Sequence, residues 1–200
     1  MVNCGSSLKY FSIVRCLSVL LAAVTLTAST DARNIYLVDT TSSTLSAKVP
    51  FLGLGRKTAF FSDVEGSIEL DNLDPEYIKL DVVIDATSLE ASDRLTSERL
   101  KGERFFWIEK HPKITYTGQR MEMVSPTQGR IEGELTARGV SKPVTLNITF
   151  ENPPARLLEG EAIHMTGTAE INRYDYNMTS YRLIVGKYVM ISLKALIVPS

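Results

Sequence analysis

The chain has 200 residues, a formal net charge of −1 and two cysteines. A nucleic-acid partner would require a basic face, so the near-neutral charge argues against one. The length suits one domain with its own hydrophobic core, and no internal repeat, low-complexity stretch or linker divides it.

The N-terminus has the pattern of a secretory signal peptide. Lys9 and Arg15 bring positive charge before an uncharged apolar run at 16–26, and small residues follow that run. The run is too short to span a bilayer, which takes roughly 20 apolar residues. We therefore predict export to the periplasm with cleavage after Ser29 or Ala32, and an uncleaved N-terminal anchor is the alternative.

Both cysteines, Cys4 and Cys16, fall inside this N-terminal segment. The mature chain is therefore expected to contain no disulfide, no thiolate metal site and no cysteine nucleophile. The predicted organisation is a signal peptide over residues 1–32 and one domain over residues 33–200.

Most of the mature chain alternates apolar and polar residues with a period of two, which is the pattern of half-buried strands. We predict strands near residues 35–40, 44–49, 58–61, 67–71, 78–85, 114–123, 131–138, 145–150, 163–171 and 188–197. Short turn sequences between them favour hairpins. An antiparallel sheet of about nine or ten strands removes its exposed edges when it closes, so the predicted fold is an all-β barrel.

Residues 85–107 interrupt this alternation. Leu100 and its charged neighbours predict a short helix around residues 92–102, with Ser92 as the N-cap and Gly102 as the stop. Three aromatic residues follow directly: Phe105, Phe106 and Trp107. The insert either closes one end of the barrel or is an ordinary polar connection whose aromatic side chains fill the core.

The apolar segment 50–55 contains Gly53-Leu54-Gly55, which is only a weak match to a phosphate loop. No third glycine follows at the required spacing, and residues 58–61 are predicted as strand rather than helix. We interpret the segment as a loop at a barrel mouth that admits an apolar ligand, with a plain β-turn as the alternative.

Catalytic and metal-binding patterns are weak. His111 and His164 are far apart and isolated, so structural or surface roles are predicted rather than metal ligation. Asp81 and Asp85 fit solvated sheet residues, and no Gly-x-Ser-x-Gly sequence is present. We therefore predict no catalytic residues, no metal site and no cofactor, and a protein that is not an enzyme.

Several segments, in this order along the chain, resemble the YceI-like proteins. The strongest is GELTARGVSKPVTL at 133–146. The others are GSIELD at 66–71, the run from 88 to 100 followed by Phe105-Phe106 and HPKITY at 111–116, and INRYDY at 171–176. The resemblance covers nearly the whole mature chain, from about Tyr36 to Val198.

The resemblance implies an extended, lipocalin-like antiparallel β-barrel that is usually periplasmic. Its apolar pocket would bind a long isoprenoid or similar lipid chain. Arg138 and Arg173 match family arginines, which would either form structural salt bridges with carboxylates or meet a polar ligand head. The candidate ligand-binding residues are Leu100, Phe105, Phe106, Trp107, Arg138, Arg173 and Tyr176.

The chain departs from the family pattern at three places. Thr41 and Ser42 stand where the family often has an early histidine. Residues 96–100 lack two polar anchors and the histidine of the family's insert, and Asn177 replaces a usual glycine. These departures affect recognition of a ligand head group more than the fold.

We predict a periplasmic binding protein that sequesters or carries a polyisoprenoid or similar lipid by burying its apolar surface. Its partner is then the lipid, with no nucleic acid and no metal, and a homodimer is left open. The first alternative is a non-catalytic envelope stress or interaction protein with a filled barrel. The second is an enzyme acting on a lipid in the pocket, for which His164 and Asp175 are the candidate residues.

Overall fold

The computed structural model describes residues 33–52, 55–71 and 77–200. The predicted signal peptide, with both cysteines, lies outside the described residues, and so does part of the apolar loop at 50–55. Among the described residues, no helix combines the length and the apolar character needed to cross a bilayer.

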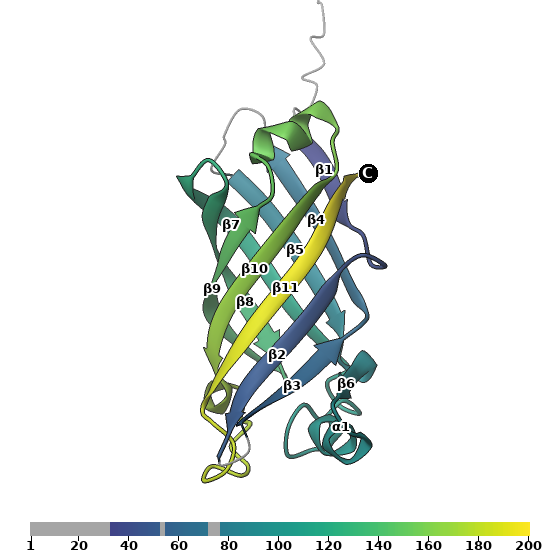
Figure 1. Cartoon of the computed structure of the whole chain (residues 1–200), viewed down its shortest axis with the longest axis vertical. Coiled ribbons are helices and arrows are strands. Elements are labelled where there is room, and N and C mark those ends of the chain that lie inside the picture. The colour runs from purple at the N-terminus through teal and green to yellow at the C-terminus, as the bar shows by residue number, and fades with distance from the viewer. Residues whose placement is uncertain (1–32, 53–54, 72–76) are drawn as a thin grey trace, which may run out of the picture. The chain divides into compact units, whose positions relative to one another are not determined.

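One antiparallel sheet makes up most of the described chain (Figure 1). Its strands are β1 (Arg33–Val38), β2 (Thr44–Phe51), β3 (Gly55–Phe61), β4 (Val64–Asp71), β5 (Tyr77–Asp85), β6 (Leu89–Ala91), β7 (Lys113–Ser125), β8 (Gln128–Ala137), β9 (Val140–Phe150), β10 (Ile163–Asn172) and β11 (Tyr188–Pro199). The helices are α1 (Arg94–Lys101) and three short 3-10 turns, η1 (Ala86–Ser88), η2 (Pro154–Glu159) and η3 (Arg173–Tyr176). Every predicted strand is present, and β6 is an addition that the sequence pattern did not indicate.

The long strand β11 closes the barrel by pairing with β1, and it also pairs with β2 along another part of its length. Strands β1, β4, β5, β7, β8, β9, β10 and β11 follow one another in hydrogen-bonded order, and β11 returns to β1. The end of β11 pairs with β1, with Leu37 opposite Val198, while its first half pairs with β2, with Leu45 opposite Leu193. From β2 the sheet continues through β3 to β6. The predicted closed antiparallel barrel is therefore confirmed.

The alternation in the sequence decides which side chains point inward. In β5, Ile78, Leu80, Val82 and Ile84 are buried, whereas Lys79 between them is exposed. Successive residues of a strand face opposite sides of the sheet. Each strand therefore contributes one set of apolar side chains to the interior of the barrel.

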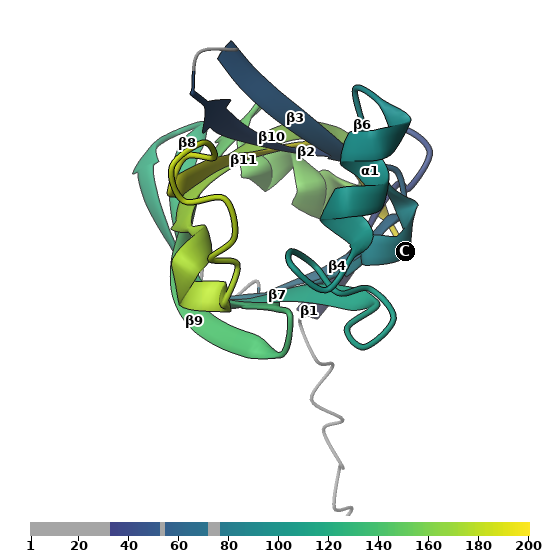
Figure 2. The same cartoon turned by 90° about the horizontal axis from the view of Figure 1, so that it is seen from below.

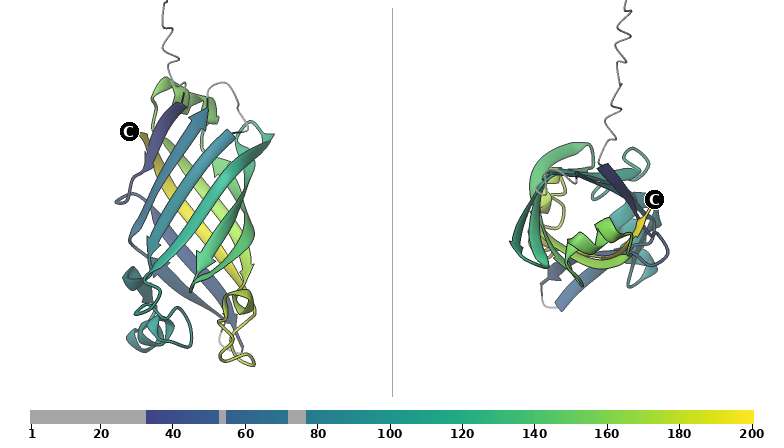
Figure 3. Two further views of the ribbon diagram at one scale, coloured as in Figure 1. Left: turned by 180° about the vertical axis from the view of Figure 1, so that it is seen from behind. Right: turned by 90° about the horizontal axis from the view of Figure 1, so that it is seen from above.

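The end of the barrel at the top of Figure 1, here called the upper half, is covered by η2 (Figure 3). The Tyr36 hydroxyl donates to the Leu157 carbonyl at 2.7 Å, which holds η2 over this end. Leu157 is fully buried there. The space left among the side chains is about 10 Å³, so the upper half is a packed core.

The opposite end, here called the lower half, carries α1 and the segment 173–187 on different sides (Figure 2). The predicted helix is confirmed, and Gly102 is its C-cap. Its predicted N-cap, Ser92, is wrong, because the Asp93 side chain accepts a hydrogen bond from Thr96 N–H at 2.8 Å. A carboxylate one residue later also interacts favourably with the positive end of the helix dipole.

Candidate functional site

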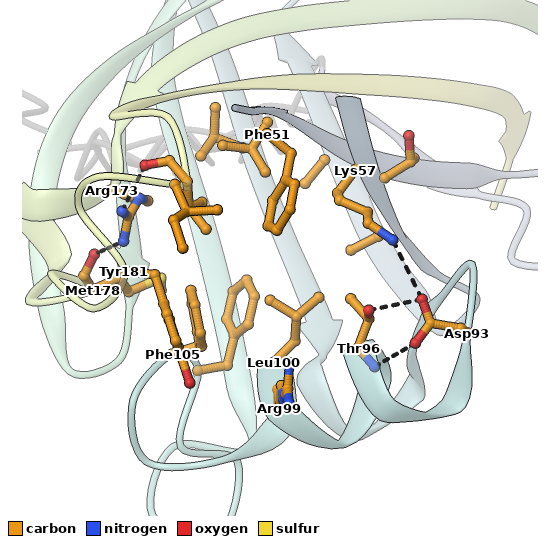
Figure 4. Close-up of a pocket in the computed structure, with 18 residues that line it drawn as sticks. Phe51, Lys57, Asp93, Thr96, Arg99, Leu100, Phe105, Arg173, Met178 and Tyr181 are labelled. Carbon is orange, nitrogen blue, oxygen red and sulfur yellow. Dashed lines mark hydrogen bonds and ion pairs between the residues drawn. The ribbon is translucent and has the colours of Figure 1, made fainter. Parts of the chain in front are cut away.

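The lower half of the barrel contains a cavity of about 400 Å³ that is partly open to solvent (Figure 4). Strands β2 and β3 form one wall, α1 and the residues after it form another, and the segment before β11 forms a third. The apolar residues of this lining are Ala47, Val49, Phe51, Ala59, Leu100, Phe105, Phe106, Met178, Ile184, Val185 and Val189. We call this space the main cavity.

A second space of about 120 Å³ lies next to the main cavity and toward the filled half. The two share Ala47, Phe106, Arg173, Met178 and Val189 in their linings. Apart from Tyr116 and Arg173, the lining of this deep cavity is made of apolar residues. The interior therefore becomes more apolar with distance from the mouth, as a site for a hydrocarbon chain requires.

Tyr116 lies where the hollow half meets the filled half. Its hydroxyl lies 2.9 Å from the Ile131 carbonyl oxygen and 3.1 Å from the Val144 carbonyl oxygen. Gly133 leaves room for the ring, since a Cβ at that position would lie 2.6 Å from the Tyr116 hydroxyl oxygen. Burial raises the pKa of Tyr116 to about 12, so this hydroxyl stays protonated across the physiological pH range.

Polar groups collect at the mouth of the main cavity, on the side of α1. Lys57 Nζ lies 3.4 Å from Asp93 Oδ2, and the Thr96 hydroxyl donates to the same carboxylate at 2.8 Å. The exposed Arg99 also reaches the lining. A ligand with an apolar chain and a polar end would thus meet most of the polar side chains at the entrance.

Arg173 is 3% exposed and lines both cavities. Its Nε donates to the Gly186 carbonyl at 2.8 Å, its Nη2 donates to the Val185 carbonyl at 3.0 Å, and its Nη1 donates to the Met178 carbonyl. Burial lowers the pKa of this guanidinium. Of the two roles that the sequence left open for Arg173, the salt bridge to a carboxylate is replaced by backbone carbonyls. Arg173 thereby fixes the segment that forms one cavity wall.

Arg138 acts in a similar way outside the cavities. Its Nη2 donates to the Glu103 carbonyl at 2.7 Å and its Nη1 donates to the Asn177 carbonyl. It lines neither the main nor the deep cavity. Its partners are again carbonyl groups rather than the carboxylates of the salt-bridge alternative, because it joins two irregular segments whose carbonyl groups have no strand partner.

The structure brings together four of the predicted ligand-binding residues and separates three. Leu100, Phe105, Phe106 and Arg173 line the main cavity. Trp107, Arg138 and Tyr176 do not line either cavity. A ligand-binding role for the first four stays a prediction that the geometry supports.

Trp107 leaves the cavity although it directly follows Phe106. Its backbone adopts a positive φ of 50°, which reverses the chain at this point. The indole ring lies 4.5 Å from Lys110 Nζ and packs edge-on against His111, with ring centroids 5.8 Å apart. His111 therefore has a structural partner, in agreement with the predicted structural role.

Tyr176 is 1% exposed, and its hydroxyl has no hydrogen-bond partner among the described residues. Burial raises the pKa of Tyr176 to about 12. The side chain is part of the hydrophobic core rather than of a cavity lining.

The candidate residues for catalysis lie outside the cavities. His164 is exposed on β10, and Asp175 is exposed and accepts a hydrogen bond from Asn172 Nδ2 at 2.8 Å. Within residues 33–52, 55–71 and 77–200, no group of three or more histidine, cysteine or acidic side chains is placed to hold a metal ion. The enzyme alternative is therefore left without the residues proposed for it.

Sequence reasoning missed two of the cavity walls. One comes from β2, where Ala47, Val49 and Phe51 share the inward face, and their alternation could have indicated it. The other comes from the segment before β11, where the Tyr181 ring stacks on Phe105 with centroids 5.9 Å apart. That segment has no periodic pattern, so nothing in the sequence indicated that it lines a cavity. Of the predicted loop at 50–55, Pro50 and Phe51 belong to β2 and Gly55 belongs to β3, whereas residues 53–54 lie outside the described residues.

Comparison with known proteins agrees with this architecture. A family model described as YceI-like domain matches residues 36–196. A Pseudomonas putida protein described as UPF0312 protein is 24% identical over 131 residues, which cover 66% of this chain and 68% of that relative.

Two solved structures have the same fold. Burkholderia cenocepacia BcnA matches with a TM-score of 0.70 and 19% identity, covering 80% of this chain and 98% of BcnA. A polyisoprenoid binding domain from Saccharophagus degradans, implicated in plant cell wall breakdown, matches with a TM-score of 0.64 and 14% identity. That match covers 82% of this chain and 98% of the domain.

Proposed function

Because the chain belongs to the YceI-like domain family, we propose that it binds a polyisoprenoid or similar long apolar lipid in the lower half of its barrel. The observation that carries this proposal is the main cavity of about 400 Å³, which continues into the deep cavity. A polyisoprenoid binding domain of the same fold supports the ligand class. A cavity of this kind also speaks against the filled-barrel alternative.

The binding energy would come from the burial of apolar ligand surface. Each buried methylene group contributes about 0.8 kcal/mol, and no covalent step is needed. The main cavity lies near the lower end of the range of roughly 300–1,000 Å³ that is typical of sites for small molecules. A long polyisoprenoid is larger than such a ligand, so one end would lie in the cavity while the rest extends through the mouth.

We also propose that the protein acts in the periplasm. The support is the charged, apolar and small-residue pattern of residues 1–32. The measurement is the intact mass of protein recovered from the periplasmic fraction. A mass that matches a chain beginning at residue 30 or 33 would support cleavage and export. Full-length protein in the membrane fraction would support the N-terminal anchor.

Native mass spectrometry tests the binding proposal directly. Protein purified from its own periplasm is expected to carry a stoichiometric lipid that is released on denaturation and identified by lipid analysis. A purified protein that carries no ligand and does not bind added isoprenoids or fatty acids would contradict the proposal. It would favour the alternative of a non-catalytic interaction protein.

An Ala47→Trp variant sharpens this test, because Ala47 lines both cavities. The indole would occupy the passage between them, so the folded variant is expected to lose most of the bound lipid. Ser46→Trp is the matched control, since Ser46 is the neighbouring residue and lies on the other face of β2. Equal lipid content in both variants would argue against this cavity as the site.

A further inference from the structure

The last residues of β2, with Leu52 after them, and the segment before β11 are joined at the lower end of the barrel. Leu52 N–H donates to the Ile184 carbonyl at 2.8 Å, and Gly186 N–H donates to the Pro50 carbonyl at 2.8 Å. Glycine permits this approach, because a Cβ at Gly186 would lie 2.9 Å from the Pro50 ring. Two segments far apart in the sequence thus form one surface.

Large apolar side chains are exposed on this surface. Leu183 is 88% exposed and Leu52 is 74% exposed, and Ile184 and Tyr181 beside them are exposed as well. We call these four residues the apolar tip. Tyr181 and Ile184 also line the main cavity, so the apolar tip is continuous with the cavity mouth. A contiguous exposed apolar patch of this kind indicates an interaction site.

Cationic side chains surround the apolar tip and the mouth. The exposed ones are Arg56, Arg94, Arg99, Arg104, Arg182 and Lys187. The same end also carries acidic residues: Asp93 and Glu98 are paired with Lys57 and Arg94, and Glu103, Glu109 and Asp175 are exposed. At the upper end, segment 151–161 carries three glutamates and one arginine. The two segments that carry the apolar tip, 50–57 and 178–187, contain Arg56, Lys57, Arg182 and Lys187 and no aspartate or glutamate, so the charge beside the apolar tip is positive.

We propose that the lower end of the barrel docks onto an anionic lipid bilayer, with Leu52, Leu183 and Ile184 inserted among the headgroups and the surrounding arginines on the phosphates. Leucine side chains that enter the interface, combined with basic residues that contact anionic headgroups, are what interfacial membrane binding requires. The upper end, which is covered by η2 and whose segment 151–161 has a net negative charge, would face away from the membrane.

This docking would explain how an apolar ligand reaches the cavity, an argument that rests on the proposed function. The mouth would lie against the bilayer, so a lipid chain could pass from the membrane into the cavity without crossing water. The part of a long chain that does not fit in the cavity would remain in the bilayer. Exposure of that part to water would otherwise oppose binding.

The test is flotation of the mature protein with vesicles of phosphatidylcholine alone or of phosphatidylcholine with phosphatidylglycerol. The protein is expected to float only with the phosphatidylglycerol vesicles, and less so at high salt. The Leu52→Ser, Leu183→Ser double variant is expected to lose roughly tenfold in vesicle affinity, because the contribution of the buried apolar area is removed. Its circular dichroism spectrum should be unchanged, since both residues are exposed.

Matched controls come from the upper end. Leu158 is 48% exposed there, and Leu158→Ser should leave vesicle binding unchanged. Arg182→Glu should weaken vesicle binding. Arg130→Glu, which reverses the charge of an exposed residue near the start of β8, should leave vesicle binding unchanged. Absence of binding to phosphatidylglycerol vesicles, or equal losses in the upper-end and lower-end variants, would overturn the proposal and leave a protein partner to explain the apolar tip.

The docking proposal and the binding proposal can fail separately. The Ala47→Trp variant should lose bound lipid yet still float with anionic vesicles, because its change lies inside the barrel. A wild-type protein that carries its native lipid but floats with no vesicle would refute docking alone. A protein that floats but contains no lipid and accepts none would refute the lipid-binding function alone.

Discussion

The upper and lower halves of the barrel share most of their strands, yet the upper half is filled and the lower half is hollow. In the upper half, large inward side chains such as Ile131, Phe150 and Leu157 meet across the barrel and leave about 10 Å³. In the lower half, Ala47 and Ala59 lie on the inward face and line a cavity of about 400 Å³. The size of the inward residue, and not the alternation itself, therefore decides where the cavity forms.

The path of the strands contributes to the same difference. At its end, β11 pairs with β1 and closes an eight-stranded ring, which side chains are just able to fill. Along its first half β11 pairs with β2 instead, and the sheet continues through β3 to the short β6, which is the last strand in that order. The helix α1 and the aromatic residues after it complete the wall there. A filled core and a ligand cavity thus coexist in one barrel.

The largest expected difference between the two halves is in the free energy of unfolding that is lost when a buried side chain is shortened. Ile131→Ala in the upper half should lower the free energy of unfolding by about 2–5 kcal/mol, because Ile131 is 1% exposed and its neighbours cannot fill the space. Leu100→Ala at the cavity should cost about 1 kcal/mol, since Leu100 already borders empty space. Urea denaturation measures both, and equal losses would show that the two halves are packed alike.

The converse change, which adds volume, sharpens the comparison. Ala195 and Ala169 are both buried, on neighbouring strands, but only Ala169 lines the deep cavity. Ala195→Ile should overpack the filled half and destabilise the protein by about 1–3 kcal/mol. Ala169→Ile should be neutral or stabilise it by about 0.5–2 kcal/mol, as cavity filling does. If Ala169→Ile destabilised the ligand-free protein as much as Ala195→Ile does, the deep cavity would not be empty in solution.

The ten main strands could be predicted because alternation is a local property of the sequence. The short β6 was missed, since three residues are too few to show a period. The hollow lower half could not be predicted, because alternation shows that Ala47 and Ala169 face inward but does not show how far away the opposite wall lies. The sequence pattern alone therefore left the filled and the hollow barrel as alternatives.

The candidate site was predicted where proximity in the sequence matched proximity in space, and missed elsewhere. Phe105 and Phe106 reach the cavity from the predicted insert, whereas the positive φ of Trp107 turns the next side chain away. Arg173 was selected as a residue that meets a carboxylate or a ligand head, but its donors are used by carbonyls of residues 5 to 13 positions away. Such contacts depend on a loop conformation that has no sequence periodicity.

The smallest expected effect is a dependence of the stability of α1, at the mouth, on pH. The filled upper half should show no such dependence. Hydrogen bonds from Thr96 lower the pKa of Asp93 from 3.8 to about 2. Because the pKa is lower in the folded state, the stabilisation is present above pH 3.8 and is lost as the pH falls toward 2. Acidification across this range should therefore loosen α1 and speed ligand release before the barrel unfolds. Hydrogen exchange of the α1 amides measures the loosening.

Asp93→Asn provides the control for this prediction, because an asparagine side chain can also cap a helix but does not titrate. The variant should keep α1 ordered at neutral pH and lose the change in exchange between pH 3.8 and 2 that depends on Asp93. Amides of β8 in the upper half should show no such step at the same pH values. If α1 and β8 lost protection together in the wild-type protein, the mouth would not open independently of the core, and the two halves would form one cooperative unit.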